Sequence, residues 1–170
     1  ILSGHSHTAD FEQISENIFE INVAGFCGAW WCGEVCIDGA PAGFKVFDFD
    51  SDDMKWIYKG CGHPLDYQMK VYVNDPDYPG QIVANVWDYD PQWKVEYFED
   101  GVKVCDMQRF KAQDILAKEL YKDPSTLKRS WVWAIPTENM FRASISEEAK
   151  KLEVRVTDRF GRVYTKVNEK

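Results

Sequence analysis

The second part of the sequence is divided into short segments in which apolar and polar residues alternate, with turn-forming residues between them. Alternation of period two gives a strand one buried face and one solvated face. From Leu65 onward this pattern predicts eight strands, at about 68–73, 81–87, 94–98, 102–108, 130–135, 141–146, 152–158 and 162–167. Eight short strands at regular spacing are typical of an immunoglobulin-like β-sandwich. We therefore expect residues 63–170 to form such a sandwich.

One segment of this region departs from the alternation. Residues 112–121 carry apolar side chains at Ile115, Leu116 and Leu120 among good helix formers. This spacing predicts a short helix in a crossover loop.

Trp131 and Trp133 lie two residues apart on the predicted strand 130–135, so they would share one face of it. Exposed aromatic faces stack on sugars, which makes the pair a candidate carbohydrate platform. A sandwich core or a seam between domains would place the two rings in the same way. We favour the core or seam, and the platform stays open.

The first 62 residues have a different character. We expect a strand at about 18–24, then an irregular Gly- and Trp-rich loop at 25–43, then a β-hairpin at 43–59. The hairpin turn, residues 50–53, is acidic but lacks the D-x-D-x-D-G frame and distal Glu of a calcium loop, so it reads as a solvated turn. Gly60 to Pro64 mark a domain boundary.

Composition excludes some classes of function. The net charge is −8, from 28 acidic and 20 basic residues, which argues against nucleic-acid binding because that needs clustered Lys and Arg. No apolar run approaches the roughly 18 residues that a membrane-spanning helix requires. We therefore expect neither a nucleic-acid partner nor a membrane span.

Five cysteines, an odd number, leave at least one thiol unpaired. Cys27, Cys32 and Cys36 are not spaced as the C-x-x-C pairs of zinc ribbons. Their apolar surroundings favour buried free thiols, whereas an oxidising compartment would make a disulfide among the three more favourable.

The strongest chemical signal is Ser3-Gly4-His5-Ser6-His7. Ile1 and Leu2 read as the last residues of a buried strand, and Gly4 allows the backbone to turn sharply after it. In an irregular loop two imidazoles can each reach a different transition-metal ion. By itself the H-x-H pattern is a weak signal, and it favours two exposed loop histidines over metal ligands.

The context of this motif resembles one known family. A strand end followed by Gly4-His5-Ser6-His7 is similar to the G-H-x-H motif of the calcineurin-like metallophosphoesterases. The segments 28–33 (GAWWCG) and 38–44 (DGAPAGF) resemble the end of the catalytic domain in exported bacterial members. The segments 93–96, 99–101 and 157–161 resemble hairpins of their β-rich C-terminal domain.

The resemblance implies that residues 1–62 are the last part of an αββα catalytic domain. It also implies that His5 and His7 each serve one of two metal ions, which would be Zn, Fe or Mn. The other metal motifs of that family, D-x-H, G-D-x-x-D, G-N-H-D/E and a lone His, precede G-H-x-H, so we expect them upstream in a longer protein. We expect no catalytic residue, no bound metal and no phosphatase activity in this chain alone. The intact protein would hydrolyse a phosphate ester in the periplasm or outside the cell.

Two further expectations follow. Trp30 and Trp31 would pack over the metal site, form a substrate wall or, as we favour, plug the base of the catalytic fold. Unpaired strand edges in residues 1–62 would make this part less stable than the sandwich and would favour a homodimer. The alternative function is an extracytoplasmic β-sandwich module that binds carbohydrate or protein.

Overall fold

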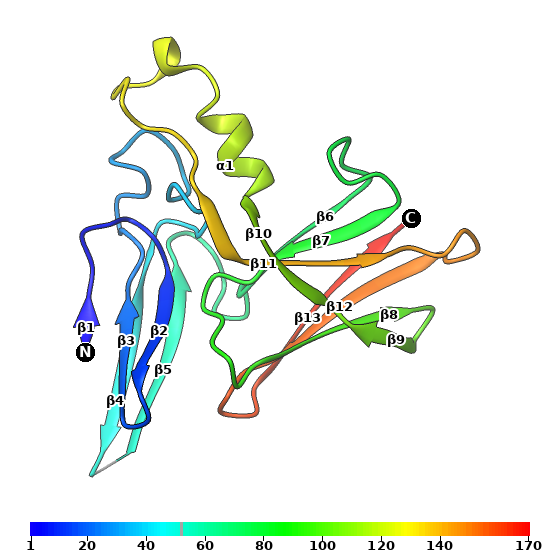
Figure 1. Cartoon of the computed structure of the whole chain (residues 1–170), viewed down its shortest axis with the longest axis horizontal. Helices are drawn as coiled ribbons and strands as arrows, with labels where there is room; N and C mark the ends of the chain where they lie inside the picture. The colour runs from blue at the N-terminus through cyan, green and yellow to red at the C-terminus, as the bar shows by residue number, and fades with distance from the viewer. Residues whose placement is uncertain (52) are drawn as a thin grey trace. The chain divides into compact units, whose positions relative to one another are not determined.

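The computed structural model describes residues 1–51 and 53–170. These residues fall into two compact units. Unit 1 comprises residues 1–68 and 112–137, and unit 2 comprises residues 69–111 and 138–170. Figure 1 shows the chain coloured from its N-terminus to its C-terminus.

The strands of unit 1 are β1 (Leu2–Ser3), β2 (Asp10–Ser15), β3 (Ile18–Asn22), β4 (Gly43–Asp50) and β5 (Asp53–Gly60). Unit 1 also holds the helix α1 (Ile115–Leu120) and a 3-10 turn at Pro124–Thr126. The strands β6 (Lys70–Val73), β7 (Gln81–Asn85), β8 (Lys94–Glu99), β9 (Val102–Asp106), β12 (Lys151–Thr157) and β13 (Val163–Glu169) belong to unit 2. Most of β10 (Gln108–Gln113) and β11 (Pro136–Ser144) lies in unit 2 as well.

Unit 2 is built from two four-stranded sheets. Their strand orders are β6-β7-β11-β10 and β9-β8-β12-β13. The alternation seen in the sequence appears as burial: Ile82 and Ala84 of β7, and Leu152, Val154 and Val156 of β12, all lie in one apolar core. The predicted mainly β fold is confirmed.

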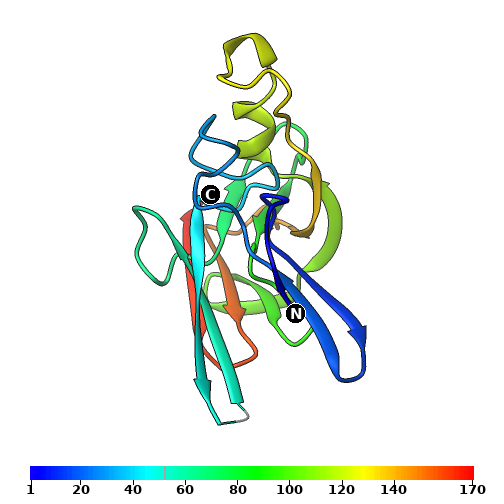
Figure 2. The ribbon, with the colours of Figure 1, turned by 90° about the vertical axis from the view of Figure 1, so that its left-hand side faces the viewer.

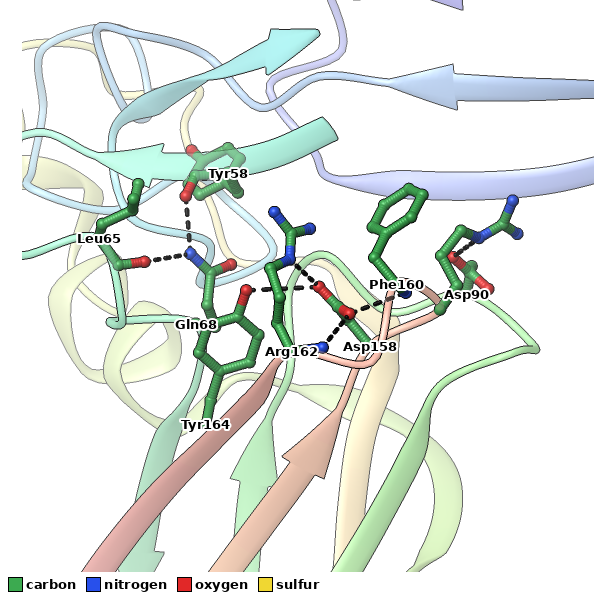
Figure 3. Close-up of polar contacts among 9 residues, drawn as sticks. Tyr58, Leu65, Gln68, Asp90, Asp158, Phe160, Arg162 and Tyr164 are labelled. Atoms are coloured by element: carbon green, nitrogen blue, oxygen red, sulfur yellow. Dashed lines mark hydrogen bonds and ion pairs between the residues drawn. The ribbon is translucent and has the colours of Figure 1, made fainter. Parts of the chain in front are cut away.

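A buried carboxylate fixes the turn between β12 and β13. Asp158 accepts hydrogen bonds from the backbone N–H groups of Phe160 and Arg162, both at 2.9 Å, and from Arg162 Nε at 2.5 Å (Figure 3). Nearby, Arg159 Nε donates to the buried Asp90 at 2.7 Å. Burying a carboxylate is costly unless it is paired and hydrogen-bonded, and here both conditions are met.

Unit 1 contains a small sheet and a separate hairpin. β3 pairs parallel with β1 and antiparallel with β2, and β4 pairs with β5 over eight residues from Gly43↔Gly60. Phe19 of β3 lies 6.0 Å, between ring centroids, from Trp56 of β5. After β5, the Gln68 side chain donates to the carbonyls of Tyr58 and Leu65, which fixes the chain at the end of this segment (Figure 3). Figure 2 shows both hairpins of the unit from the side.

The predicted helix is confirmed and is held against the Gly- and Trp-rich loop. Asp114 caps α1 by accepting from Ala117 N at 2.9 Å. At Gly39, which has φ +86°, an added Cβ would lie 2.1 Å from Asp114 Cγ, so only glycine fits there. Tyr121 donates its hydroxyl proton to the carbonyl of Val35. The loop at 25–43 is irregular, as expected, and is nevertheless anchored.

Several strand predictions are wrong. No strand covers 130–135 in the part of the chain that the structure describes, and β2 and β10 were not predicted. Residues 130–135 alternate in polarity without belonging to a ladder. Leu2 does lie in a strand, but it is not buried: its neighbour in the sheet is β3, and Ile1 and Leu2 are 65% and 50% exposed. The acidic turn includes Asp52, which lies outside the described residues.

Candidate functional site

The loop that carries His5 and His7 follows β1 directly and has an unusual backbone. Both histidines have positive φ, +79° and +57°, a region that residues with a Cβ rarely enter. Asn22 of β3 fixes the loop, because its Nδ2 donates to Ser6 Oγ at 2.5 Å and to Thr8 O at 2.7 Å. Such strain persists only where the surroundings hold it, and it is concentrated at functional sites.

A buried carboxylate holds the end of the same loop. Asp38 accepts from the backbone N–H of Ala9 at 2.6 Å and of Ala40 at 3.0 Å. Burial raises the pKa of Asp38 to about 7, with Asp10 adding to the rise, and the two backbone donors work against it. Asp38 therefore ties the segment after His7 to the loop at 25–43.

His7 is the better placed of the two predicted metal ligands. Its Nδ1 lies 2.6 Å from the carbonyl oxygen of Gly28. A carbonyl can only accept, so Nδ1 carries the proton and a neutral imidazole keeps its lone pair on Nε2. Metal-binding histidines characteristically donate their other ring N–H in this way.

Gly25 makes room for this imidazole. A Cβ on Gly25 would lie 2.6 Å from His7 Nδ1 and 3.2 Å from Gly28 O. Position 25 must therefore be a glycine for steric reasons, although it lies in the glycine-rich loop and not in the histidine motif.

The donor set fits a metal only in part. His5 is exposed to solvent. Within residues 1–51 and 53–170 no group of three His, Cys, Asp or Glu side chains is arranged to hold an ion. The free nitrogen of His7 suits a metal ligand, but the described residues do not complete a metal centre around it.

Aromatic rings from three segments that are distant in the sequence form a series from His7 through Trp30 to Trp131. Trp30 stacks on the imidazole with 3.9 Å between centroids and 18° between planes. Trp131 meets Trp30 edge-on at 4.8 Å. The structure thus brings together three of the predicted site residues, whereas no ring contact joins Trp31 or Trp133 to them among the described residues.

The four predicted wall residues differ in burial. Trp30 is partly buried and packs against the small core that α1 shares with the loop. Trp31, Trp131 and Trp133 are 67%, 50% and 62% exposed. The expectation that Trp131 and Trp133 lie in a sandwich core is therefore wrong, and the alternative of a seam between domains stays a prediction. The buried residues of that segment are Val132 and Ala134, which alternate with the tryptophans.

Other residues of the site were not predicted. Asn22 and Asp38 act through their side chains, Gly28 acts through its backbone carbonyl, and Gly25 acts through the space that it leaves. The high glycine content of residues 25–43 was the only sequence signal for Gly25 and Gly28, and it does not say which glycine faces a histidine.

All five cysteines are free in the structure. Cys36 is buried, and burial raises the pKa of its thiol, with the charge of Asp38 adding to the effect. A disulfide among Cys27, Cys32 and Cys36 is not formed. Within the described chain, no helix has the length and apolar character needed to span a membrane.

Unit 2 has a pocket of its own, of about 400 Å³. Its apolar lining comes from Tyr89, Trp93 and Phe141, and charged side chains including Lys103 and Arg109 stand around it. Arg109 lies over the ring of Tyr89 at 4.8 Å.

Comparison with known proteins gives one result. Residues 20–164 match the family described as the C terminal of calcineurin-like phosphoesterase. Neither the curated proteins nor the solved structures include a match. Because the matched segment spans most of the sequence, this chain belongs to the family of C-terminal domains of calcineurin-like phosphoesterases.

Proposed function

We propose that this chain is the C-terminal part of a metal-dependent phosphoesterase, in which His5 and His7 each bind one of two metal ions. The observation that carries the proposal is the imidazole of His7, held through Nδ1 by Gly28 so that Nε2 is available. The family match supports the phosphoesterase assignment but begins at residue 20, after both histidines.

Each residue of the site has a distinct task in this proposal. Paired divalent ions, when bound, supply Lewis-acid activation and neutralise charge at the phosphate. Gly28 fixes the tautomer of His7, Gly25 leaves space for its ring, and Trp30 fixes the plane of the ring. Asp38 and Asn22 hold the strained loop. Two imidazoles cannot satisfy two ions, because each ion needs about four to six ligands.

The test compares the intact parent protein with this chain. In the parent, His7→Ala should remove bound Zn, Fe or Mn, measured by elemental analysis, and should abolish hydrolysis of an aryl phosphate. Gly25→Ala should act similarly, because its Cβ would displace the imidazole. Gly4→Ala is the matched control, since its Cβ meets only Val23 O at 3.8 Å. Metal-stimulated turnover by the chain alone would contradict the proposal.

A spectroscopic test needs no activity. Nitrogen-15 NMR of the imidazoles should show His7 with its proton on Nδ1, because Gly28 accepts it. A proton on Nε2 instead would remove the argument for His7 as a ligand.

We also propose that unit 2 is an immunoglobulin-like sandwich. The strand orders β6-β7-β11-β10 and β9-β8-β12-β13 correspond to the A-B-E-D and C′-C-F-G orders of that fold. An experimental structure with another strand order would refute it. The proposed location, periplasmic or extracellular, rests on the resemblance of the sequence to exported bacterial members, and fractionation of the source cells would test it.

One observation favours a second function, a binding module for carbohydrate. The pocket in unit 2 has a volume within the range of ligand sites, and both aromatic and charged side chains line it. Tyr89→Ala and Arg109→Ala should each weaken retention of the chain on a panel of immobilised polysaccharides. Retention unchanged in both variants, or absent in the parent chain, would remove this candidate.

A further inference from the structure

Trp30, which stacks on the proposed metal ligand His7, and the following residue, Trp31, adopt a rare backbone conformation. Trp30 has φ +51° and Trp31 has φ +62°, in the left-handed region that is unfavourable for bulky residues. Residues of the histidine loop share this feature. Strain at two loops that meet at one imidazole indicates that the positions of their side chains matter.

The segment that supplies Trp131 is held firmly although it is not a strand. Val132 and Ala134 are buried in the core of unit 1. Ile135 N donates to Ile37 O at 2.9 Å, and Gln113 Nε2 donates to Ala134 O at 2.7 Å. These bonds anchor the backbone, and the two buried side chains leave Trp131 and Trp133 on the solvent side.

The rings form a continuous series that starts at His7. The centroid distances of 3.9 Å and 4.8 Å place the Trp131 ring within about 9 Å of the imidazole. Trp131 is half exposed, so a ligand can reach it. Exposing a large aromatic ring to water is unfavourable, and exposed rings of this kind are enriched at sites where a partner covers them.

We propose that Trp30 and Trp131 form an aromatic wall beside His7 that binds the ring of a phosphate ester's alcohol group, so that the substrate class is ring-bearing phosphate esters. The inference rests on the proposed function, because it takes His7 as the place where the phosphate is bound. Aryl groups and sugars share the required chemistry, a flat face with little charge. A short acyclic alcohol such as glycerol lacks it.

The first test uses the 170-residue chain and does not depend on metal or activity. Saturation-transfer NMR should detect binding of phenyl phosphate and of glucose 1-phosphate, and no binding of glycerol 2-phosphate. Loss of one stacking partner by Trp131→Ala should weaken binding about 10-fold. The relative signals of the two ring ligands tell whether an aromatic or a sugar face is preferred.

Two variants control for loss of structure and loss of exposed aromatic area. Trp131→Phe keeps a ring and should retain most of the binding, even where Trp131→Ala fails to fold. Phe49→Ala removes another exposed aromatic, 64% accessible at the far end of β4, and should leave binding unchanged. Equal binding by glycerol 2-phosphate, or no ring binding by the parent chain, would overturn the inference.

The second test separates this inference from the proposed function. In the intact parent protein, Trp131→Ala should reduce kcat/KM for phenyl phosphate about 10-fold more than for glycerol 2-phosphate. Hydrolysis with unchanged preference would refute the aromatic wall and leave the phosphoesterase intact. Absence of metal-dependent hydrolysis in the parent would instead refute the proposed function, whereas the NMR experiment would still decide whether the wall binds rings.

Discussion

The two units of this chain cover their apolar residues to different extents. Among the described residues, sixteen large hydrophobic side chains are exposed, and twelve of them lie in unit 1; the other four are valines of unit 2. All exposed aromatic rings of that set, for example Phe26 and Trp31, belong to unit 1. Unit 2 encloses its core between two sheets, whereas unit 1 has a small core and an apolar surface.

This difference indicates that the two units are built for different surroundings. A sheet of several strands whose apolar face is covered is stable by itself. A two-stranded hairpin such as β4–β5 is only marginally stable in water. Exposed apolar surface of this extent marks an interaction site. We interpret unit 1 as a surface prepared for a neighbour, which the proposed catalytic domain would supply.

Hydrogen exchange should give the largest contrast. Amides of β7, β8 and β12 should exchange at least about 100-fold more slowly than those of β1 and β2, because only the former lie over an enclosed core. The measurement is residue-resolved exchange by NMR. Equal protection in the two units would contradict the inferred difference in their stability.

A matched pair of leucine substitutions should show how differently the two units depend on their apolar side chains. Leu152→Ala opens a cavity in the core of unit 2 and should cost about 2–5 kcal/mol of unfolding free energy. Leu2→Ala, at a half-exposed position of unit 1, should change it by no more than about 0.5 kcal/mol. Urea titrations of both variants would check this, and a large loss in Leu2→Ala would mean that the exposed surface is already covered.

The two units should also respond oppositely to pH. The pKa of Asp38 in unit 1 is raised to about 7, so folding favours its protonated form, and the associated stability is present below about pH 4 and lost as the pH rises towards 7. Glu99 in unit 2 behaves in the reverse sense. Partial burial opposes the shift, but hydrogen bonds from Ser146 and Tyr97 lower its pKa, so its contribution is lost in acid.

Denaturant titrations followed through NMR signals of each unit, at pH 4 and pH 8, would measure this. Asp38→Asn should reduce the loss of stability of unit 1 between pH 4 and pH 8 and leave the response of unit 2 unchanged. Unit 1 gaining stability between pH 4 and 8 would contradict the assignment to Asp38.

The smallest expected effect is self-association. Ile1, Leu2, Ile18 and Phe49 line an apolar pocket of about 370 Å³ in unit 1, beside the unpaired edge of β1. We expect a weak homodimer through this edge, detected by sedimentation over a concentration series and reduced by Leu2→Lys. If the chain stays monomeric at every concentration, this surface does not mediate self-association and would instead contact another partner.

The sequence predicted unit 2 better than unit 1, for a physical reason. Along β12 the side chains of Leu152, Val154 and Val156 alternate because one face is buried, so the period reports the structure directly. The segment at 130–135 shows the limit of this reasoning. Val132 and Ala134 alternate with exposed neighbours as in a strand, yet the backbone is held by single hydrogen bonds to Ile37 and Gln113 rather than by a ladder.

The candidate site was only partly predictable. The histidine motif and the tryptophans are visible in the sequence, and the structure joins His7, Trp30 and Trp131. What positions them is not visible, because the Gly28 carbonyl and the space at Gly25 are backbone properties set by the tertiary fold.

The discontinuity of unit 1 has a consequence for biosynthesis. Its core needs Tyr121 and Val132 as well as Ala29 and Val35 from the loop. Nascent chains fold in order as they leave the ribosome, so this shared core cannot close until the segment that ends at residue 137 has been added. During that delay the growing polypeptide is accessible to chaperones and proteases for longer than a contiguous domain of equal size would be accessible.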